Sequence, residues 1–420
     1  MSEPNDSSVC EIGTGNDGEL QLPDDLKRRW DISPGKKFRV EETPQGLRLI
    51  PLEPPLRKIY LEPTSRCNLS CRTCVRNSWD EPIGSMEMSV YRKLIADLRE
   101  VHSLQSMAFW GIGEPLVHPG IVDMVALAHD AGLKTELITN GLLLDGDMAR
   151  GMINAGLDTL VVSLDGTTET TYTGIRTGGD LGLVQDNVRG LNRLRARMFR
   201  SNPEVGLEFV VMRSNVDQLP DLARIARNLE AAFIVVTNLL PCTPDMKDEI
   251  LYWLSAQVKN TAQRSQWYPE LVLPRIDQRT EYHTPLFDLQ RRIGRIVHTR
   301  NDTPEDDYCP FIREGSASLT WSGDVSPCVA LMHSYRCYVL GREKSIRRFS
   351  MGNVATERIA DIWNREEYRA FRSRVIGFDF SPCIQCSGCD YTDTNDEDCY
   401  GNPHPVCGDC LWSKRILLCP

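Results

Sequence analysis

Long hydrophobic runs are missing from this sequence. The longest, from Ala231 to Val236, has six residues, whereas a helix that crosses a bilayer needs roughly 18 or more. We therefore expect no membrane-spanning helix. The first residues are polar and acidic, unlike a secretion signal or a transit peptide, which predicts a cytoplasmic protein. An excess of Lys and Arg is also missing, because the 420 residues carry a formal net charge of −10. Without a concentration of basic side chains, we expect no binding to nucleic acid.

Cysteine, in contrast, is abundant and unevenly distributed. There are 15 cysteines, of which three lie between Cys67 and Cys74 and ten between Cys309 and Cys419. Such density indicates disulfides in small secreted domains, but this chain shows no export signal. In a reducing compartment, closely spaced cysteines are typical of metal sites. We therefore interpret both groups as metal ligands.

Strand-like and helix-like segments alternate through residues 57–241. The strand-like runs are apolar, and the segments between them have apolar residues at spacings of three and four, which is typical of amphipathic helices. This alternation predicts a parallel sheet covered by helices. We expect an α/β protein with a partial (β/α)6 TIM-like barrel, whose chemistry should collect in the loops after the strand C-termini. The six predicted strands are KIYLEP, MAFWG, KTELIT, TLVVSLD, GLEFVVM and FIVVTNLLP.

Four further segments flank the predicted barrel. Residues 1–17 are expected to be disordered. Residues 18–52 contain two short alternating runs around a PQG turn, which predicts a small β-rich module. Residues 242–308 are expected to form a mainly helical connector, with DEILYWLSAQVKN and LFDLQRRIGRIV as helices, and residues 309–420 a cysteine-rich domain.

The module at 18–52 resembles the swapped-hairpin module of AbrB-type transition-state regulators, which bind DNA as dimers. Between Glu11 and Ile50, however, eight acidic residues nearly cancel seven basic ones. DNA binding requires a basic patch. We therefore favour docking or packing as the role of this module.

Three cysteines follow the first predicted strand with the spacing Cys67-x3-Cys71-x2-Cys74. A cubane iron–sulfur cluster normally takes one thiolate for each of its four irons. Three thiolates from one loop would leave the fourth iron open, and an open position distinguishes a catalytic metal site from a structural one. Structural zinc favours four ligands in paired C-x2-C hooks, so zinc fits this loop poorly.

The CxxxCxxC spacing resembles the signature of the radical S-adenosylmethionine (radical SAM) superfamily. Thr73 stands where that family usually has an aromatic residue. The resemblance implies a [4Fe–4S] cluster on these cysteines, with S-adenosyl-L-methionine (AdoMet) chelated by the open iron. It also implies reduction by a ferredoxin or flavodoxin, cleavage of AdoMet to a 5′-deoxyadenosyl radical, and abstraction of hydrogen from a substrate. These motifs identify no catalytic residue that would act on the substrate itself.

The loops after the next three predicted strands resemble family motifs in the same order: WGIGEP, a TNG motif and an SLDG segment. Arg176 lies where related enzymes place an arginine for the methionine carboxylate, which a bidentate guanidinium suits, although a solvated surface arginine would fit this position nearly as well. The resemblance implies the AdoMet-binding residues Gly113, Glu114, Pro115, Asn140, Ser163, Asp165 and Arg176. Candidates for adenine or substrate contacts by position alone are Met212, Asn215, Asn238 and Leu240.

The C-terminal cysteines resemble the SPASM domain, an iron–sulfur extension of some radical SAM enzymes. Cys309, thirteen residues, Gly323, four residues and Cys328 match the start of that domain, and WSGDVSPC predicts a hairpin turn. Because Cys389 comes earlier than in the usual spacing, the cysteines cannot be paired into clusters from the sequence. Nine thiols would supply two auxiliary [4Fe–4S] clusters with one to spare, while the two CxxC hooks leave a zinc ribbon as an alternative. The nine are Cys309, Cys328, Cys383, Cys386, Cys389, Cys399, Cys407, Cys410 and Cys419.

Two segments carry a narrower resemblance. YLEPTSRCNLSCRTCVRNSWDEPIGSM and DCYGNPHPVCGDCLWSKRILLCP look like the radical SAM/SPASM maturases of tungsten-containing aldehyde:ferredoxin oxidoreductases. This implies a maturase whose partner is a tungsten-containing oxidoreductase or its cofactor precursor. Two alternatives stay open: modification of a peptide, as in ribosomal-peptide or sulfatase maturation, and a non-catalytic iron–sulfur protein for electron transfer or assembly. The intact GEP, TNG and SLDG loops argue against the second, because an electron carrier has no need of them.

Overall fold

The structure is a computed structural model of the chain. The predicted ligand Cys386 lies outside the described residues. Residues 1–11 of the N-terminal segment and parts of the connector also lie outside them. Within the described part of the chain, every helix is too short or too polar to cross a membrane. The residues described are 12–30, 32, 38–43, 46–51, 53–257, 270–293, 309–385 and 389–419.

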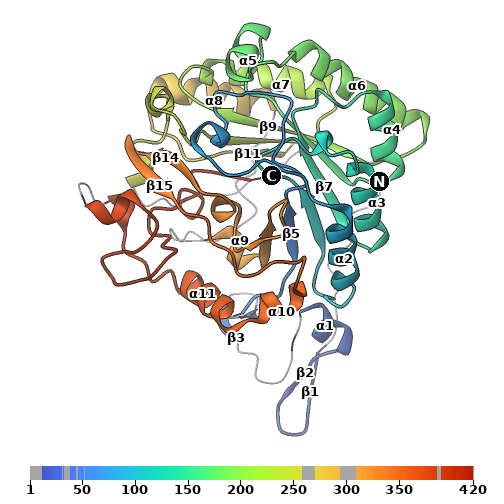
Figure 1. The fold of residues 1–420 in the computed structure, drawn as a ribbon, viewed down its shortest axis with the longest axis vertical. Helices are drawn as coiled ribbons and strands as arrows, with labels where there is room; N and C mark the ends of the chain where they lie inside the picture. Colours follow the sequence, from blue (N-terminus) through green and yellow to red (C-terminus); the bar gives the residue numbers. More distant parts are fainter. Residues whose placement is uncertain are drawn as a thin grey trace.

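A nine-stranded sheet forms the centre of the molecule (Figure 1). Its order is β11-β10-β9-β8-β7-β6-β5-β12-β13, and all neighbours are parallel except β12 and β13. The six predicted strands are β5 to β10, which confirms the α/β fold with a mainly parallel sheet. The bounds are β5 Lys58–Leu61, β6 Ser106–Phe109, β7 Lys134–Thr139, β8 Thr159–Ser163, β9 Glu204–Val211, β10 Phe233–Asn238, β11 Glu270–Val272, β12 Ser316–Leu319 and β13 Val325–Ser326.

Each edge of this six-stranded core carries a parallel strand that the sequence did not predict. β11 comes from the connector and pairs with β10, while β12 comes from the cysteine-rich domain and pairs with β5. The two strands are three and four residues long, too short for a periodic pattern to identify them. In the described ranges, β11 and β13 are not hydrogen-bonded to each other. The barrel therefore remains a partial one.

Helices cover the outer face of the sheet (Figure 1). Side chains such as Ile59 and Leu61 of β5 face this layer and pack with Tyr91 and Leu94 of the first covering helix in one large core. The amphipathic segments between the predicted strands form helices, as expected, and α2, α3 and α7 are among them. The bounds are α2 Met88–Leu98, α3 Ile121–Asp130, α4 Gly146–Asn154, α5 Glu169–Ile175, α6 Leu181–Arg197, α7 Leu219–Asn228 and α8 Thr280–Ile293.

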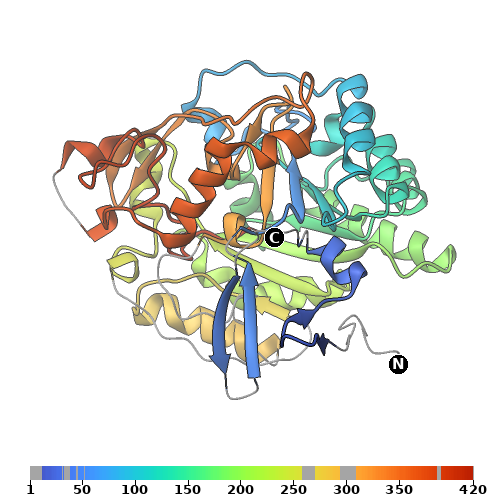
Figure 2. The same cartoon turned by 90° about the horizontal axis from the view of Figure 1, so that it is seen from below.

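The concave face of the sheet holds a second apolar cluster. Tyr60, Ala108, Ile138 and Val161 come from β5, β6, β7 and β8 and lie opposite the outward-facing positions, because neighbouring side chains of a strand alternate between faces. They pack against side chains of the C-terminal domain, which therefore fills the inside of the partial barrel. In both views the C-terminus lies near the centre of the molecule (Figures 1 and 2). The C-terminal residues in this lumen cluster are Phe311, Val329, Met332, Cys309, Cys328, Trp412 and Cys419.

The connector differs in part from its prediction. LFDLQRRIGRIV begins within α8, but DEILYWLSAQVKN is not an α-helix in its described part, which contains only short 3-10 turns. Leu251 packs into the large core, whereas Ile250 and Tyr252 pack into a separate cluster with Tyr335. Because alternate residues face opposite sides, the chain here is extended between two apolar clusters and the predicted helix is wrong.

The N-terminal part contains the predicted hairpin, β3 (Phe38–Thr43) and β4 (Gly46–Pro51), which is antiparallel and stands apart from the barrel sheet (Figure 2). The segment 1–17, which we expected to be disordered, includes the strand β1 (Gly13–Thr14). β1 pairs with β2 (Leu20–Gln21), and α1 (Asp24–Arg29) follows.

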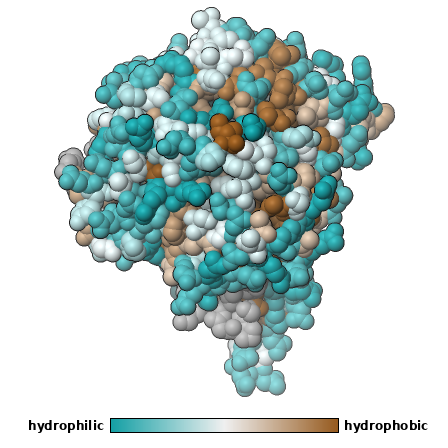
Figure 3. Space-filling view, viewed as in Figure 1, coloured by the Kyte–Doolittle hydropathy of each residue, from teal (hydrophilic) through white to brown (hydrophobic). Residues whose placement is uncertain are grey.

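The C-terminal domain begins with α9 and the β12–β13 hairpin at the predicted WSGDVSPC turn, where Gly323 has a φ of 89° that favours glycine. The face of the molecule in Figure 3 is mostly hydrophilic, with apolar residues gathered mainly toward the end opposite the N-terminal part. The remaining elements are α9 Pro310–Arg313, β14 Tyr335–Val339, β15 Arg342–Ile346, α10 Ile359–Asn364 and α11 Glu366–Gly377.

Candidate active site

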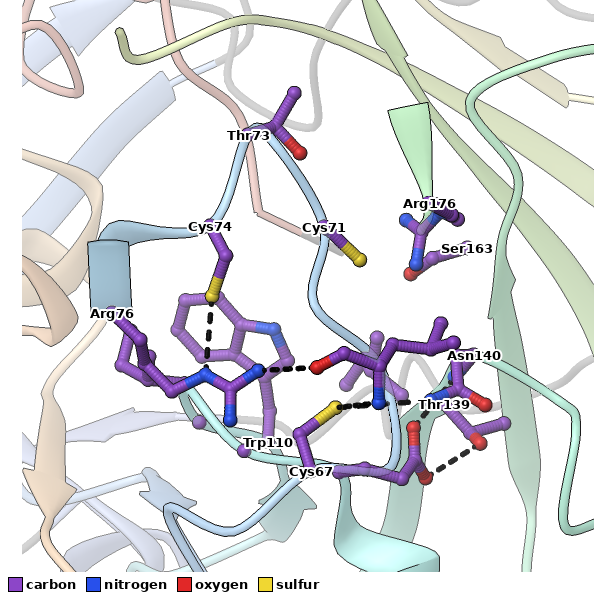
Figure 4. A pocket seen from close by; sticks show the side chains of 16 residues that line it. Cys67, Cys71, Thr73, Cys74, Arg76, Trp110, Thr139, Asn140, Ser163 and Arg176 are labelled. Atoms are coloured by element: carbon purple, nitrogen blue, oxygen red, sulfur yellow. Dashed lines mark hydrogen bonds between the residues drawn. The ribbon is translucent and has the colours of Figure 1, made fainter. Parts of the chain in front are cut away.

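The three cysteines of the CxxxCxxC loop lie around one cavity of about 170 Å³, formed by loops that follow the barrel strands (Figure 4). Cys67, Cys71 and Cys74 are free, partly buried thiols. They are the only cysteines among the described residues that line this cavity. Its lining also includes Leu69, Thr73, Arg76, Trp110, Gly111, Ile112, Gly113, Glu114, Ile138, Thr139, Asn140, Ser163 and Arg176.

Two of these sulfur atoms accept hydrogen bonds from the protein. The backbone N–H of Leu69 donates to Cys67 Sγ at 3.4 Å, and Arg76 Nε donates to Cys74 Sγ at 3.3 Å. A terminal nitrogen of Arg76 also donates to the Leu69 carbonyl at 2.8 Å, which fixes the guanidinium across the loop. Such N–H groups and a positive charge stabilise thiolates, the form in which cysteine binds iron.

Burial governs the acidity of the thiols. It raises the pKa of Cys67, and it raises the pKa of Cys71 to about 11, although the charge of Arg176 opposes this rise for Cys71. Thiols with raised pKa values lose their protons when a metal binds. Three thiols around one cavity, with two arginines close by and no fourth cysteine in the described lining, fit a cubane cluster that keeps one iron open.

The GEP loop is held against the cysteine loop. The backbone N–H of Glu114 donates to the Arg66 carbonyl at 2.8 Å. The Glu114 carboxylate is buried and accepts from Thr139 Oγ1 at 2.7 Å, from the Asn140 N–H at 2.7 Å and from the Leu116 N–H at 3.0 Å. Burial raises the pKa of Glu114, and these donors oppose the rise. Glu114 therefore joins the loops after β6 and β7.

Asn140 of the TNG motif completes this connection. Its Nδ2 donates to Asn68 Oδ1 at 2.9 Å and lies 4.0 Å from Cys67 Sγ. Pro115 opens a short 3-10 turn that is capped by the Glu114 side chain, and it is buried behind the lining. The structure thus brings the predicted residues of the cysteine, GEP and TNG loops to one cavity.

Ser163 and Arg176 line the opposite side of the cavity (Figure 4). Arg176 Nε lies 2.9 Å from Asp165 Oδ2, and the Arg176 side chain is only 12% exposed. The alternative of a solvated surface arginine is therefore wrong. Asp165 is buried and also accepts from the Val210 N–H at 3.1 Å, so it anchors Arg176 to β9 rather than lining the cavity.

Glu208 is a residue of this region that sequence reasoning missed. It lies on β9, where Ser163 Oγ donates to its Oε2 at 2.9 Å. Burial raises the pKa of Glu208 to about 7, which the Ser163 hydrogen bond and Arg176 oppose. The available signal was a single acidic residue inside the apolar run GLEFVVM.

The four candidates chosen by position do not line the cavity. Asn215 donates to the carbonyls of Asp165 and Val210, and Asn238 donates to the carbonyls of Arg275 and Ile416. These amides hold loops and the C-terminal tail in place. Met212 packs in a small buried cluster, and Leu240 packs at the edge of the cluster around Tyr252.

Four C-terminal cysteines lie close together. Burial raises the pKa of Cys309 to about 12 and raises the pKa of Cys328 well above its ordinary value, and nearby thiols add to both shifts. Burial and the neighbouring Cys309, Cys328 and Cys410 likewise raise the pKa of Cys407. Burial raises the pKa of Cys383, and the nearby charged groups and thiols that affect it are Asp409, Lys344 and Cys399. The structure thus brings Cys309, Cys328, Cys407 and Cys410 near one another.

Comparison with known proteins agrees with this geometry. Residues 61–256 match the family model of the radical SAM superfamily, and residues 309–390 match that of the SPASM iron–sulfur cluster-binding domain. The chain is 34% identical to the tungsten-containing aldehyde ferredoxin oxidoreductase cofactor-modifying protein of Pyrococcus furiosus, over 87% of this chain and 97% of the relative. It is 30% identical to the PqqA peptide cyclase of Gluconobacter oxydans, over 87% and 94%.

Solved structures show the same fold at low sequence identity. Native anSMEcpe with bound AdoMet aligns with a TM-score of 0.53 at 16% identity, over 86% of this chain and 95% of that one. Streptococcus suis SuiB bound to the precursor peptide SuiA aligns with a TM-score of 0.54 at 15% identity, over 79% and 70%. With the three-cysteine cavity, the family matches and the full-length relative in agreement, this chain belongs to the radical SAM superfamily and is an AdoMet-binding enzyme with a C-terminal SPASM iron–sulfur domain.

Proposed function

We propose that this enzyme matures a tungsten-containing oxidoreductase by modifying its cofactor or a precursor of that cofactor. The observation that carries the proposal is the 34% identity to a protein of that role, which extends along 97% of the relative and 87% of this chain. An alignment of this extent includes most of both the barrel and the C-terminal domain. The relative therefore supports more than the shared AdoMet chemistry.

The residues around the cavity support the chemical step. A [4Fe–4S] cluster on Cys67, Cys71 and Cys74, with AdoMet at the open iron, would supply one-electron cleavage of AdoMet and abstraction of hydrogen from the substrate. Arg76 and the Leu69 N–H hold the thiolate charge.

AdoMet would be held by the loops that line the cavity. In this proposal the Gly113 carbonyl and the Glu114 carboxylate receive the methionine ammonium, and Pro115 fixes their backbone. Arg176, anchored by Asp165, takes the methionine carboxylate as a planar donor. Asn140 and Ser163 complete the AdoMet contacts, since both line the cavity.

For the auxiliary domain we propose two [4Fe–4S] clusters. Cys309, Cys328, Cys407 and Cys410 would hold the first, because these four partly buried thiols influence one another. The second would use Cys383, Cys386, Cys389 and Cys399, with Cys383 near Cys399 in support. Cys419 would be the spare thiol, and Trp412 Nε1 donates to its Sγ at 3.3 Å.

The first auxiliary site borders the barrel lumen. Cys309 and Cys328 pack in the lumen cluster, and so does Trp110, which also lines the AdoMet cavity. A cluster there could receive an electron from a substrate held between the two sites. A ferredoxin or flavodoxin would supply the electron that starts the reaction, and we expect this to take place in the cytoplasm.

Modification of a peptide is the second candidate function. Its support is the 30% identity to a peptide cyclase along 94% of that relative. The two candidates differ in their product, because one changes the cofactor of an enzyme and the other changes the mass of a polypeptide.

The test is to purify a tungsten-containing oxidoreductase from cells with and without this gene. We expect the enzyme from deletion cells to have lower activity and an altered or missing cofactor, with an unchanged polypeptide mass. Restoring the gene should recover activity, whereas a gene with all three cavity cysteines replaced should not. Identical activity, metal content and cofactor in both preparations would refute the proposal. A change in polypeptide mass alone would favour peptide modification.

A further inference from the structure

A buried histidine joins two carboxylates where the C-terminal domain meets the barrel. His333 Nε2 lies 2.9 Å from Glu62 Oε2, and His333 Nδ1 lies 2.7 Å from Glu81 Oε2. The His333 and Glu62 side chains are 5% and 0% exposed. The Trp79 ring packs edge-on against the imidazole, with ring centroids 4.5 Å apart. The three residues come from segments that are far apart in the sequence.

The geometry determines the charge of this histidine. A carboxylate oxygen only accepts hydrogen bonds, and a neutral imidazole has a single N–H. With a carboxylate against each ring nitrogen, both nitrogens must carry protons. Burial lowers the pKa of His333, but the hydrogen bonds and charges of Glu62 and Glu81 outweigh it and raise the pKa to about 9.

Glu62 connects this imidazolium to the AdoMet cavity. Glu62 follows β5 directly, and its Oε1 accepts from the Ile112 N–H at 3.0 Å. Its side chain also occupies the space beside Gly111, where an added Cβ would lie 2.4 Å from Glu62 Cγ. Gly111 and Ile112 both line the cavity. The position of the GEP loop therefore depends on Glu62.

Glu81 and the chain before His333 connect the imidazolium to the cysteine loop on one side and to the auxiliary-cluster domain on the other. Glu81 follows the cysteine loop, and its Oε1 accepts from the Ser334 N–H at 2.7 Å. His333 lies five residues after Cys328, from which it is separated by the 3-10 turn Val329–Leu331. The short chain from Cys328 to His333 and the hydrogen bonds of Glu62 thus link the auxiliary-cluster domain to Ile112.

We propose that His333 is a positioning residue that couples the auxiliary-cluster domain to the AdoMet-binding loop. It acts through Glu62 on Gly111 and Ile112, so AdoMet affinity depends on the imidazolium. Among the described residues, the charged groups that act on it are Glu62 and Glu81, and Trp79 is uncharged. The inference rests on AdoMet binding in this cavity and does not depend on which substrate is modified.

The test is anaerobic calorimetric titration of the full-length, iron-reconstituted protein with AdoMet between pH 7 and pH 10. At pH 7.5 we expect His333→Gln to bind AdoMet roughly fivefold more weakly or worse, the lower end of typical coupling between sites. The KM for AdoMet should rise more than the kcat for 5′-deoxyadenosine formation falls. AdoMet itself changes its protonation over this pH range, but this affects its binding to both proteins equally. The ratio of wild-type to His333→Gln affinity therefore reports the protein alone. This ratio should approach one as the pH rises through about 9, where wild type loses the imidazolium.

Glu81→Gln keeps the test decisive if His333→Gln fails to fold. Removing one of the two carboxylates lowers the pKa of His333, so the loss of AdoMet affinity should move to lower pH. His404→Gln is the matched control, because His404 belongs to the same domain but contacts the Asn395 and Arg348 carbonyls instead of the barrel. It should bind AdoMet like wild type at every pH.

Wild-type AdoMet affinity in His333→Gln with full iron content would overturn the inference. So would an unmoved pH profile in Glu81→Gln. Failure of the tungsten proposal would give a different result. The activity of the tungsten-containing oxidoreductase would then not depend on this gene, whereas AdoMet affinity would still fall in His333→Gln.

Discussion

Gly113 lies against the carbonyl oxygen of Thr64 so closely that an added Cβ would stand 2.1 Å from that oxygen. The same Cβ would lie 2.6 Å from the Arg66 carbonyl oxygen, which already accepts the Glu114 N–H. All of these neighbours are backbone atoms, so they cannot move aside as a flexible side chain would. The GEP loop and the start of the cysteine loop therefore fix each other's position.

Gly113→Ala should disrupt both the radical cluster and AdoMet binding. The Cβ must push the GEP loop away from Thr64 and Arg66, which displaces the loop that carries Cys67. We expect loss of about four irons, the content of one cubane, and no measurable 5′-deoxyadenosine. Iron analysis and product chromatography check this. Gly146→Ala, at the start of α4 with no atom within 4 Å of the added Cβ, should retain both properties. Wild-type turnover in Gly113→Ala would show that the two loops are not coupled.

Replacing Cys67, Cys71 and Cys74 together by Ala should abolish 5′-deoxyadenosine formation and leave the auxiliary iron in place. The three thiols all line the cavity, and the auxiliary cysteines belong to another part of the chain. Iron analysis together with electron paramagnetic resonance distinguishes the remaining clusters from the missing one. Cys242→Ala removes a buried thiol outside the cavity lining and should keep the full iron content. 5′-Deoxyadenosine at the wild-type rate from the triple variant would refute the assignment of the site.

The double variant Cys407→Ala, Cys410→Ala tests how the auxiliary cysteines are paired. If these two thiols share a cluster with Cys309 and Cys328, about four of roughly twelve irons should be lost, on the rule of one thiolate per iron. Uncoupled AdoMet cleavage should continue, because neither residue lines the cavity. Loss of about eight irons would mean that the two residues serve different clusters. Zinc in place of iron would establish the zinc-ribbon alternative.

The sequence predicted the barrel strands well because each is a continuous apolar run that ends at an unusual loop. The predicted strand KTELIT, for example, has the same bounds as β7. Thr139 and Asn140 of the TNG motif lie at its C-terminal end, and both line the cavity at the C-terminal edge of the parallel sheet. The loops were predictable because their short motifs carry the site residues themselves.

What the sequence could not predict depends on contacts between distant segments. β12, with the sequence SASL, becomes a strand because it pairs with β5 far earlier in the chain. The Glu62, Glu81 and His333 group is likewise assembled from three separate segments. The proximity of Cys309 and Cys410 was hidden for the same reason, since the two thiols are far apart in the sequence.

Glu208→Gln should stabilise the protein at pH 8 and have little effect at pH 5. The pKa of Glu208 is raised to about 7 from 4.5, so the folded state binds a proton that the unfolded state has released. A raised pKa contributes stability that is fully present below 4.5 and is lost as the pH rises through about 7. Glutamine keeps the acceptor for the Ser163 hydroxyl and carries no charge at any pH. The variant should therefore not lose this stability as the pH rises. Thermal unfolding of the iron-loaded protein at both pH values measures the effect.

Glu204→Gln on the same strand is the matched control for this prediction. Glu204 is the first residue of β9 and is exposed to solvent, so its replacement should change the melting temperature little and equally at pH 5 and pH 8. The informative quantity is the difference between the two variants, because every other ionisable group is common to both. If Glu208→Gln gives no more stabilisation at pH 8 than at pH 5, Glu208 is already ionised without cost. The carboxylate would then be hydrated or paired with Arg176, and its role would be to orient Ser163 and not to hold a proton near neutral pH.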